Sequence, residues 1–129
     1  MAILFNEVTK EFHLYNDHVS YIITILQNNQ LGQLYYGKRI RHNDSFAHLL
    51  ETSKRAMAAC VYEGNPFFTL EHFKLEYPTY GTGDFKYPAY EIMQENGSHV
   101  TNFEYVSHKI YRGKPALIDC LPATYVEDE

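Results

Sequence analysis

The sequence predicts a mainly β domain, an antiparallel β-sandwich with at most one short helix. Twelve Tyr and eight Phe occur among 129 residues, and aromatic side chains pack better on pleated strands than in helical bundles. Short apolar runs alternate with turn-forming residues along most of the chain. The length fits one domain, and an apolar fraction of 45% supplies a core that needs no metal or disulfide staples.

Four strands are expected in the first third of the chain. The apolar runs 3–5 and 12–15 give the first two, because a polar stretch separates them. Residues 19–26 form a nearly continuous β-branched and aromatic run, and residues 31–36 return after a polar turn. We therefore expect these two runs to form the central pair of strands.

From residue 40 to residue 64 the strand pattern stops, and a broken helical spacing predicts a loop with one short helix at most. Connections of this length inside a small β domain are either functional or poorly ordered. Polar side chains of this stretch suit the binding of hydroxyl groups, but a mixed-charge loop is also ordinary protein surface. These polar residues are Asp44, His48, Glu51, Lys54 and Arg55.

Residues 76–85 crowd aromatic rings, turn formers and one acid into an irregular loop. Pro78 disfavours a helix, and Gly81 and Gly83 can adopt backbone angles that other residues avoid. One interpretation is a structural turn in which Asp84 bonds its own loop and the core rings are Tyr77, Tyr80 and Phe85. The other is a sugar site, where a ring packs on a pyranose and the carboxylate binds its hydroxyls.

Extended chain is expected again at residues 67–70, 89–94 and 98–111. Asn96-Gly97 lies between the last two runs and predicts a hairpin with a type I′ turn, whose central residues both need positive φ.

The end of the sequence predicts an interrupted fold. Residues 116–118 start another extended piece, and residues 125–126 start a strand that ends at Glu129 without a turn or a returning arm. We therefore expect residues 1–129 to be a single β-rich unit, a truncated domain with exposed sheet edges.

Composition argues against several partners. The net charge is −5 and Lys and Arg are scattered, so neither nucleic acid nor an anionic membrane is an expected partner. No signal peptide or membrane span is visible, so we expect a cytoplasmic protein. Cys60 and Cys120 are isolated, and we expect two buried thiols, although one disulfide between them remains an alternative.

No cofactor or metal is expected, because the histidines and cysteines lack the spacing of metal ligands. The histidines, which we expect mostly at the surface or in loops, are His13, His18, His42, His48, His72, His99 and His108. No serine elbow, phosphate-binding glycine loop or kinase motif is present. Glycoside hydrolysis needs two facing carboxylates, and nothing in the spacing pairs the acids of this chain. The sequence therefore predicts no catalytic residue.

Four separated motifs, collinear between residues 12 and 127, resemble a known family. They are GQLYYGKR at 32–39, EYPTYGTGDF at 76–85, YVSHKIYRGKP at 105–115 and LPATYVE at 121–127. Together they resemble the N-terminal domain of retaining α-galactosidases of glycoside hydrolase family 36.

The resemblance implies a larger β-sandwich, a supersandwich domain, placed before a (β/α)8 barrel that removes terminal α-linked galactose from sugars such as melibiose and raffinose. The family's aspartate nucleophile and aspartate acid/base both lie on that barrel. The barrel is absent from this sequence, so the resemblance implies that the chain alone is inactive.

In tetrameric members of the family, loops of this domain help to wall the galactose pocket of a neighbouring subunit. The resemblance places that role in the 40–64 stretch. Some relatives carry an aspartate shortly after the phenylalanine that corresponds to Phe46, whereas this chain has Leu50 and Glu51 there. The resemblance thus implies that Glu51, with Arg55 and His48, binds substrate. The alternative is that these residues are plain loop surface. The aromatic loop then becomes a fixed corner of the sandwich that can also face a neighbour.

Two other classes of function stay open. A free-standing carbohydrate-binding module would use the same sandwich to hold sugar directly. A protein-interaction domain would instead use its open sheet edges for self-association.

Overall fold

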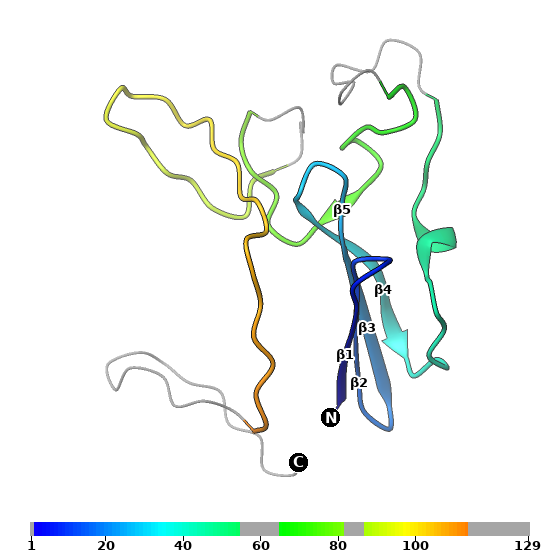
Figure 1. The fold of residues 1–129 in the computed structure, drawn as a ribbon. Helices are drawn as coiled ribbons and strands as arrows, with labels where there is room; N and C mark the ends of the chain where they lie inside the picture. The colour runs from blue at the N-terminus through cyan, green and yellow to red at the C-terminus, as the bar shows by residue number, and fades with distance from the viewer. Residues whose placement is uncertain (1, 55–64, 82–86, 114–129) are drawn as a thin grey trace.

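The structure is a computed structural model that describes residues 2–54, 65–81 and 87–113. Its described part contains one antiparallel sheet with the strands in chain order, β1-β2-β3-β4-β5 (Figure 1). The strands are β1 (Ala2–Asn6), β2 (Glu11–Tyr15), β3 (Val19–Ile25), β4 (Leu31–Lys38) and β5 (Lys74–Leu75), and a single 3-10 turn, η1, spans Ala47–Leu49. The prediction of a mainly β chain with at most one short helix is confirmed. The second sheet of the sandwich stays a prediction.

Strand β3 lies in the middle of the sheet and is buried on one face. The fully buried face carries Ser20, Ile22 and Thr24, and the opposite face, with Ile23, is half-buried. This alternation follows from the period of two along a strand. The pairing of β3 with β4 contains a bulge in which Leu34 is the extra residue, and bulges of this kind bend a strand. The predicted central pair is therefore confirmed.

A small apolar core lies beside the β3–β4 hairpin. It consists of Leu26, Phe68, Leu70 and Phe73, with Leu50 packed against it. The rings of Phe68 and Phe73 are 5.0 Å apart. The chain that follows the 40–64 stretch thus buries its apolar side chains on the end of the hairpin.

The prediction of extended chain at residues 67–70 is wrong. This segment turns instead: the amide of Phe68 donates to the carbonyl of Asn65 (3.3 Å), and the amide of Phe73 donates to the carbonyl of Leu70 (3.3 Å). The side chain of Asn65 also accepts a bond from the amide of Phe67 (3.0 Å). Asn side chains that bond the backbone two residues on favour turns over strands.

The hairpin at Asn96-Gly97 is confirmed, but its turn type is not. The amide of Gly97 donates to the carbonyl of Gln94 (2.9 Å), and the amide of Gln94 donates to the carbonyl of Ser98 (2.9 Å). Gly97 has φ of 79°, whereas Asn96 does not have positive φ. These bonds close a three-residue hairpin loop whose last residue, Gly97, is left-handed, a common loop of antiparallel strands. The hairpin stands away from the sheet (Figure 1), and its arms form no strand.

Candidate functional site

The described part of the predicted 40–64 site is the 40–54 segment, which leaves β4 and runs beside the sheet (Figure 1). Its start is tied to strands β3 and β1. The amide of Ile40 donates to Ser20 Oγ (3.0 Å), and Asn6 Nδ2 donates to the carbonyl of Asp44 (2.9 Å). These bonds join residues far apart in the sequence, so the sheet sets the path of the loop.

A carboxylate on strand β2 holds the next residues of the loop. Glu11, which is only 6% exposed, accepts a bond from Ser45 Oγ on Oε1 (3.0 Å) and from the amide of Phe46 on Oε2 (2.8 Å). Ser45 Oγ in turn accepts a bond from the amide of Ala47, the first residue of η1 (3.1 Å). Hydrogen bonds to an ionised acceptor are about twice as strong as neutral ones. The start of η1 is therefore bound to the sheet.

An aromatic and imidazole cluster anchors the same turn. The ring of Phe46, 3% exposed, packs edge-on against His13 with centroids 5.3 Å apart. His13 Nδ1 lies 3.0 Å from His42 Nδ1, and His13 Nε2 lies 3.0 Å from Ser20 Oγ. His13 is 2% exposed, so the expectation of a surface or loop residue is wrong here. It fails because His13 lies on the buried face of β2, where a neutral imidazole is tolerated when both nitrogens have partners.

The free energy of unfolding is expected to fall as the pH is lowered from about 7.5 to 5.5. Burial, and then the nearby His42 and Arg39, hold the pKa of His13 below its usual value of 6.5. The unfolded chain thus takes up this proton near pH 6.5 and the folded chain only at lower pH. This contribution to stability is complete above pH 6.5 and is lost as the pH falls below 6.5.

Thermal unfolding at several pH values, with the variant His13→Gln, checks this dependence. The variant should be less stable at pH 7.5 and should lose less stability on acidification. His18→Gln, at an exposed position, is the matched control and should keep the full dependence. Equal pH slopes in His13→Gln and the unmodified protein would contradict the assignment.

The predicted substrate-binding residues lie at and beyond the end of the anchored turn. His48 and Glu51 are exposed, and Leu50 between them packs against the apolar core. Glu51 Oε1 lies 3.5 Å from His72 Nδ1, which leaves 66% of the Glu51 side chain accessible. Within the part of the chain that the structure describes, no hydrogen bond joins His48 to Glu51, and Arg55 lies outside that part. Their role in substrate binding stays a prediction.

Two residues of this region were not predicted as part of it. His72, between the core residues Leu70 and Phe73, places Nδ1 3.5 Å from Glu51 Oε1 and Nε2 3.3 Å from Ser53 Oγ. Glu11 holds Ser45 and the amide of Phe46 from strand β2. Neither lies near the 40–54 segment in the sequence. The one available signal is the placement of Glu11 two residues before His13, which puts two polar side chains on one face of an apolar strand.

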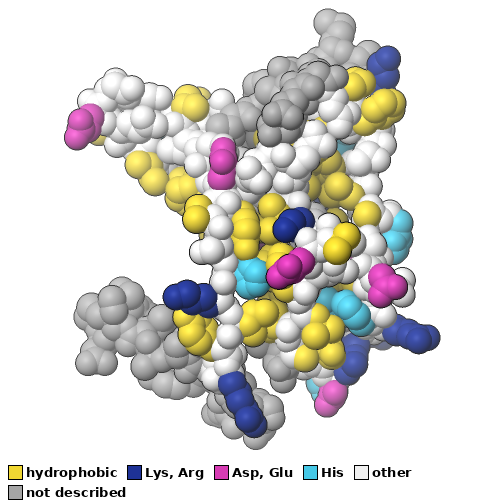
Figure 2. Space-filling model, in the orientation of Figure 1, with side chains coloured by type: hydrophobic (Ala, Val, Ile, Leu, Met, Phe, Trp, Pro, Cys, Tyr) yellow, Lys and Arg dark blue, Asp and Glu magenta, His cyan; other side chains and the backbone are white. Residues whose placement is uncertain are grey.

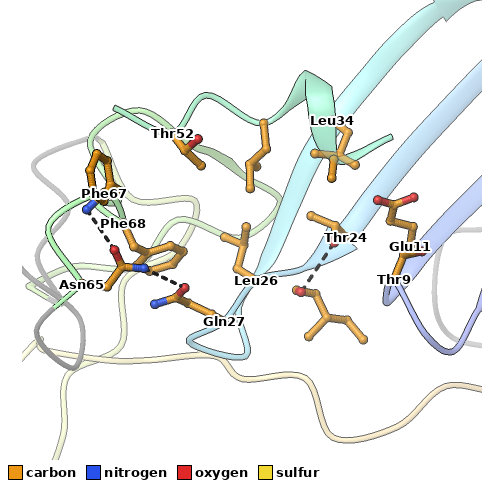
Figure 3. Close-up of a pocket in the computed structure, with 13 residues that line it drawn as sticks. Thr9, Glu11, Thr24, Leu26, Gln27, Leu34, Thr52, Asn65, Phe67 and Phe68 are labelled. Carbon is orange, nitrogen blue, oxygen red and sulfur yellow. Dashed lines mark hydrogen bonds between the residues drawn. The ribbon is translucent and has the colours of Figure 1, made fainter. Parts of the chain in front are cut away.

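A cavity of about 240 Å³ separates this loop from the sheet (Figure 3). Thr9 and Glu11 lie at one end, and Asn65, Phe67 and Phe68 lie at the other. Among the described residues that line it, Glu11 is the one acid, and the described lining of a second cavity, of about 210 Å³, also has one acid, Glu104. Neither cavity, as formed by the described residues, presents the two facing carboxylates that glycoside hydrolysis requires.

The aromatic loop is attached to the sheet and to the projecting hairpin. Tyr21 Oη donates to the carboxylate of Glu76, and burial together with this bond raises the pKa of Tyr21. The amide of Ala89 donates to the carbonyl of Pro78 (2.9 Å), and the amide of Thr101 to that of Tyr80 (3.1 Å). These contacts fit the interpretation as a fixed corner.

The rings of this loop are not core residues where the structure describes them. Tyr77 is 59% exposed and Tyr80 is 54% exposed, whereas Thr79 between them is fully buried. The prediction of Tyr77 and Tyr80 as core is therefore wrong, because the loop turns Thr79 inward instead. Phe85 and Asp84 lie outside the described residues, so the sugar-site interpretation stays untested.

Three further observations concern the surface, metal binding and membrane-spanning helices. Figure 2 shows hydrophobic side chains over the sheet and along the projecting hairpin, with Lys and Arg placed singly on the face drawn. Within the ranges 2–54, 65–81 and 87–113, no three His, Cys, Asp or Glu side chains are grouped so that they could hold a metal ion. In those ranges, too, no helix has the length and hydropathy that crossing a membrane would require. Cys60 and Cys120 lie outside them.

The family model described as Glycosyl hydrolase family 36 N-terminal domain matches residues 29–129. The chain belongs to this family. As a member of it, the domain is 40% identical to α-galactosidase AgaA of Geobacillus stearothermophilus over 129 residues, which are 100% of the chain and 17% of that enzyme. The predicted resemblance to α-galactosidases of glycoside hydrolase family 36 is thus confirmed.

Solved structures agree with the sequence relation. The fold of this family 36 N-terminal domain matches the crystal structure of the α-galactosidase AgaB of Geobacillus stearothermophilus with a TM-score of 0.81 and 40% identity, covering 99% of the chain and 17% of AgaB. A variant of AgaA, crystallised in complex with raffinose, matches with a TM-score of 0.79 and 39% identity, covering 92% of the chain and 16% of that structure. The domain therefore spans about a sixth of the enzymes it matches.

Proposed function

We propose that the chain is the non-catalytic N-terminal portion of a cytoplasmic, retaining α-galactosidase that hydrolyses terminal α-galactosides of the melibiose and raffinose type. The observation that carries this proposal is the family match over residues 29–129. A relative that was crystallised with raffinose supports the substrate class. The single carboxylate in each described cavity supports the placement of catalysis outside this chain. Neither a cofactor nor a metal is part of the proposal.

Within that enzyme, the domain contributes to oligomer assembly and to the wall of a neighbouring subunit's substrate pocket. The 40–54 segment is suited to the second role, because it is bound to the sheet at Phe46 and to the core at Leu50 while His48 and Glu51 face outward. Glu51, with Arg55 and His48, would bind sugar hydroxyls. A carboxylate accepts hydrogen bonds from neutral hydroxyls without repelling them, which suits a galactoside.

Replacing Glu51 by glutamine in the enzyme expressed from the whole reading frame is expected to raise KM for melibiose about tenfold. The value of kcat should change less than about twofold, because a wall residue acts on binding and not on the reacting bond. The matched control is Glu95→Gln at the exposed tip of the hairpin, which should leave both constants unchanged. Unchanged KM in both Glu51→Gln and His48→Ala would contradict the proposed wall.

A free-standing carbohydrate-binding module is the second candidate function. The cavity favours it, because Gln27 and Asn65 offer amide groups beside the partly exposed ring of Phe67. Calorimetric titration of the chain with galactose and with melibiose separates the two functions. Millimolar or tighter binding would favour the module, whereas no measurable heat would favour the enzyme portion.

A further inference from the structure

Glu11 is a buried carboxylate with no counter-ion among the described residues. Its two oxygens accept one bond each, from Ser45 Oγ (3.0 Å) and from the amide of Phe46 (2.8 Å). Acidic residues are depleted in strands and rarely fully buried unless paired, so an apolar residue would be the ordinary choice at this position of β2. The two bonds account for its presence, because they satisfy the carboxylate and fix its orientation.

The turn that Glu11 holds has no side-chain capping bond from its own N-cap residue. Phe46 precedes η1 as its N-cap residue, and its side chain makes no capping hydrogen bond. The amide of Phe46 instead reaches the carboxylate, and the amide of Ala47 reaches Ser45 Oγ, which donates to the same carboxylate. One side chain on the sheet thus supplies, directly and through Ser45, the acceptors for the first two amides of the turn.

The segment after this attachment is an arch with two fixed ends. Glu11 holds its beginning at Ser45 and Phe46, and Leu50 holds its end against the core. His48 lies between the two ends and Glu51 follows directly, both exposed. Three residues separate Phe46 from Leu50 and four separate it from Glu51, so a shift at the beginning of the arch moves His48 and changes how the chain reaches Glu51.

We propose that Glu11 is a positioning residue, which sets the placement of His48 and Glu51 by holding the start of η1. This inference rests on the proposed function of the loop as a wall of the substrate pocket. In this proposal Glu11 does not contact the substrate. Its action passes through the backbone of residues 45–51.

The first arm of the test is amide hydrogen exchange in the 129-residue protein. In Glu11→Gln the amide of Phe46 should exchange about tenfold faster, because glutamine offers one acceptor and places an amide group against the other donor. The amide of Leu26, bonded to the carbonyl of Gln30 (2.8 Å), should be unchanged and reports that the sheet is intact. Glu7→Gln, at an exposed position, is the matched control. Unchanged exchange at Phe46 would overturn the inference.

The second arm measures melibiose hydrolysis by the enzyme from the whole reading frame. Glu11→Gln should raise KM about threefold with kcat nearly constant, a split that a general loss of folding would not produce. If KM rises in Glu51→Gln but not in Glu11→Gln, the inference about Glu11 is wrong and the proposed function still holds. If the exchange at Phe46 is fast but KM is unchanged in both Glu51→Gln and Glu11→Gln, the proposed pocket wall is wrong, and the inference that rests on it fails as well. Should Glu11→Gln fail to fold, Ser45→Ala removes one of the two bonds and should show the same changes at smaller size.

Discussion

Replacing Phe46 by alanine is expected to lower the free energy of unfolding by about 3–5 kcal/mol, the range for removing a buried phenylalanine ring. The ring is 3% exposed and packs against His13 with centroids 5.3 Å apart. Its loss leaves a cavity between the loop and strand β2, and it exposes the imidazole that the ring covers. The fall in the free energy of unfolding should therefore include a contribution from the weakened attachment of the loop, in addition to the contribution from burying the ring.

Denaturant unfolding followed by circular dichroism measures this effect. Leu49→Ala is the matched control, because Leu49 belongs to the adjacent turn but is 39% exposed. It should cost less than about 1 kcal/mol. A Phe46→Ala variant as stable as Leu49→Ala would show that the loop is not packed on the sheet in solution.

Replacing Gly81 by alanine is the second change with a large expected effect, about 2–3 kcal/mol of destabilisation. Gly81 has φ of 83°, a left-handed conformation that costs other residues about 1–2 kcal/mol. An added Cβ would also lie 2.8 Å from Cγ2 of Val100, closer than such atoms approach. The aromatic loop and the projecting hairpin would then have to separate.

The matched control for Gly81→Ala is Gly97→Ala. Gly97 has nearly the same φ, 79°, but a Cβ there would meet no atom within 4 Å. Gly97→Ala should therefore show the conformational cost alone, about 1–2 kcal/mol. Thermal unfolding of both variants measures the difference, and equal losses would contradict the contact between the aromatic loop and Val100.

Much of the fold follows from local pattern. The strands β1 to β4 were predicted because apolar runs, turn residues and their spacing lie within a few residues of one another. The left-handed Gly81 and the hairpin at residues 96–97 follow from single residue types with known backbone preferences. These features depend on short-range sterics, so the sequence expresses them directly.

The errors arise where a local pattern competes with another local bond or with tertiary contacts. Residues 67–70 have strand composition, but the side chain of Asn65 bonds the amide of Phe67 and favours a turn. Asn96-Gly97 suits a type I′ turn, yet Asn96 Oδ1 accepts a bond from the amide of Ser98 (2.9 Å) and the longer hairpin loop forms. Histidine is a residue type more often found at the surface. The burial of His13 depends on Phe46 and His42, which lie far along the chain.

The candidate site was predictable only in part for the same reason. Resemblance to relatives directs attention to Glu51, but its contact with His72 links residues that no short motif contains. The attachment of the loop by Glu11 spans 34 and 35 residues to Ser45 and Phe46. Such pairings appear only once the sheet has placed β2 beside the loop.

The most direct test of the central claim, that this domain serves catalysis performed elsewhere, is hydrolysis of p-nitrophenyl α-galactoside by the chain alone and by the product of the whole reading frame. The account predicts hydrolysis by the longer protein and none above the buffer rate by residues 1–129. Release of p-nitrophenol by purified residues 1–129, at a rate that scales with their concentration, would contradict it.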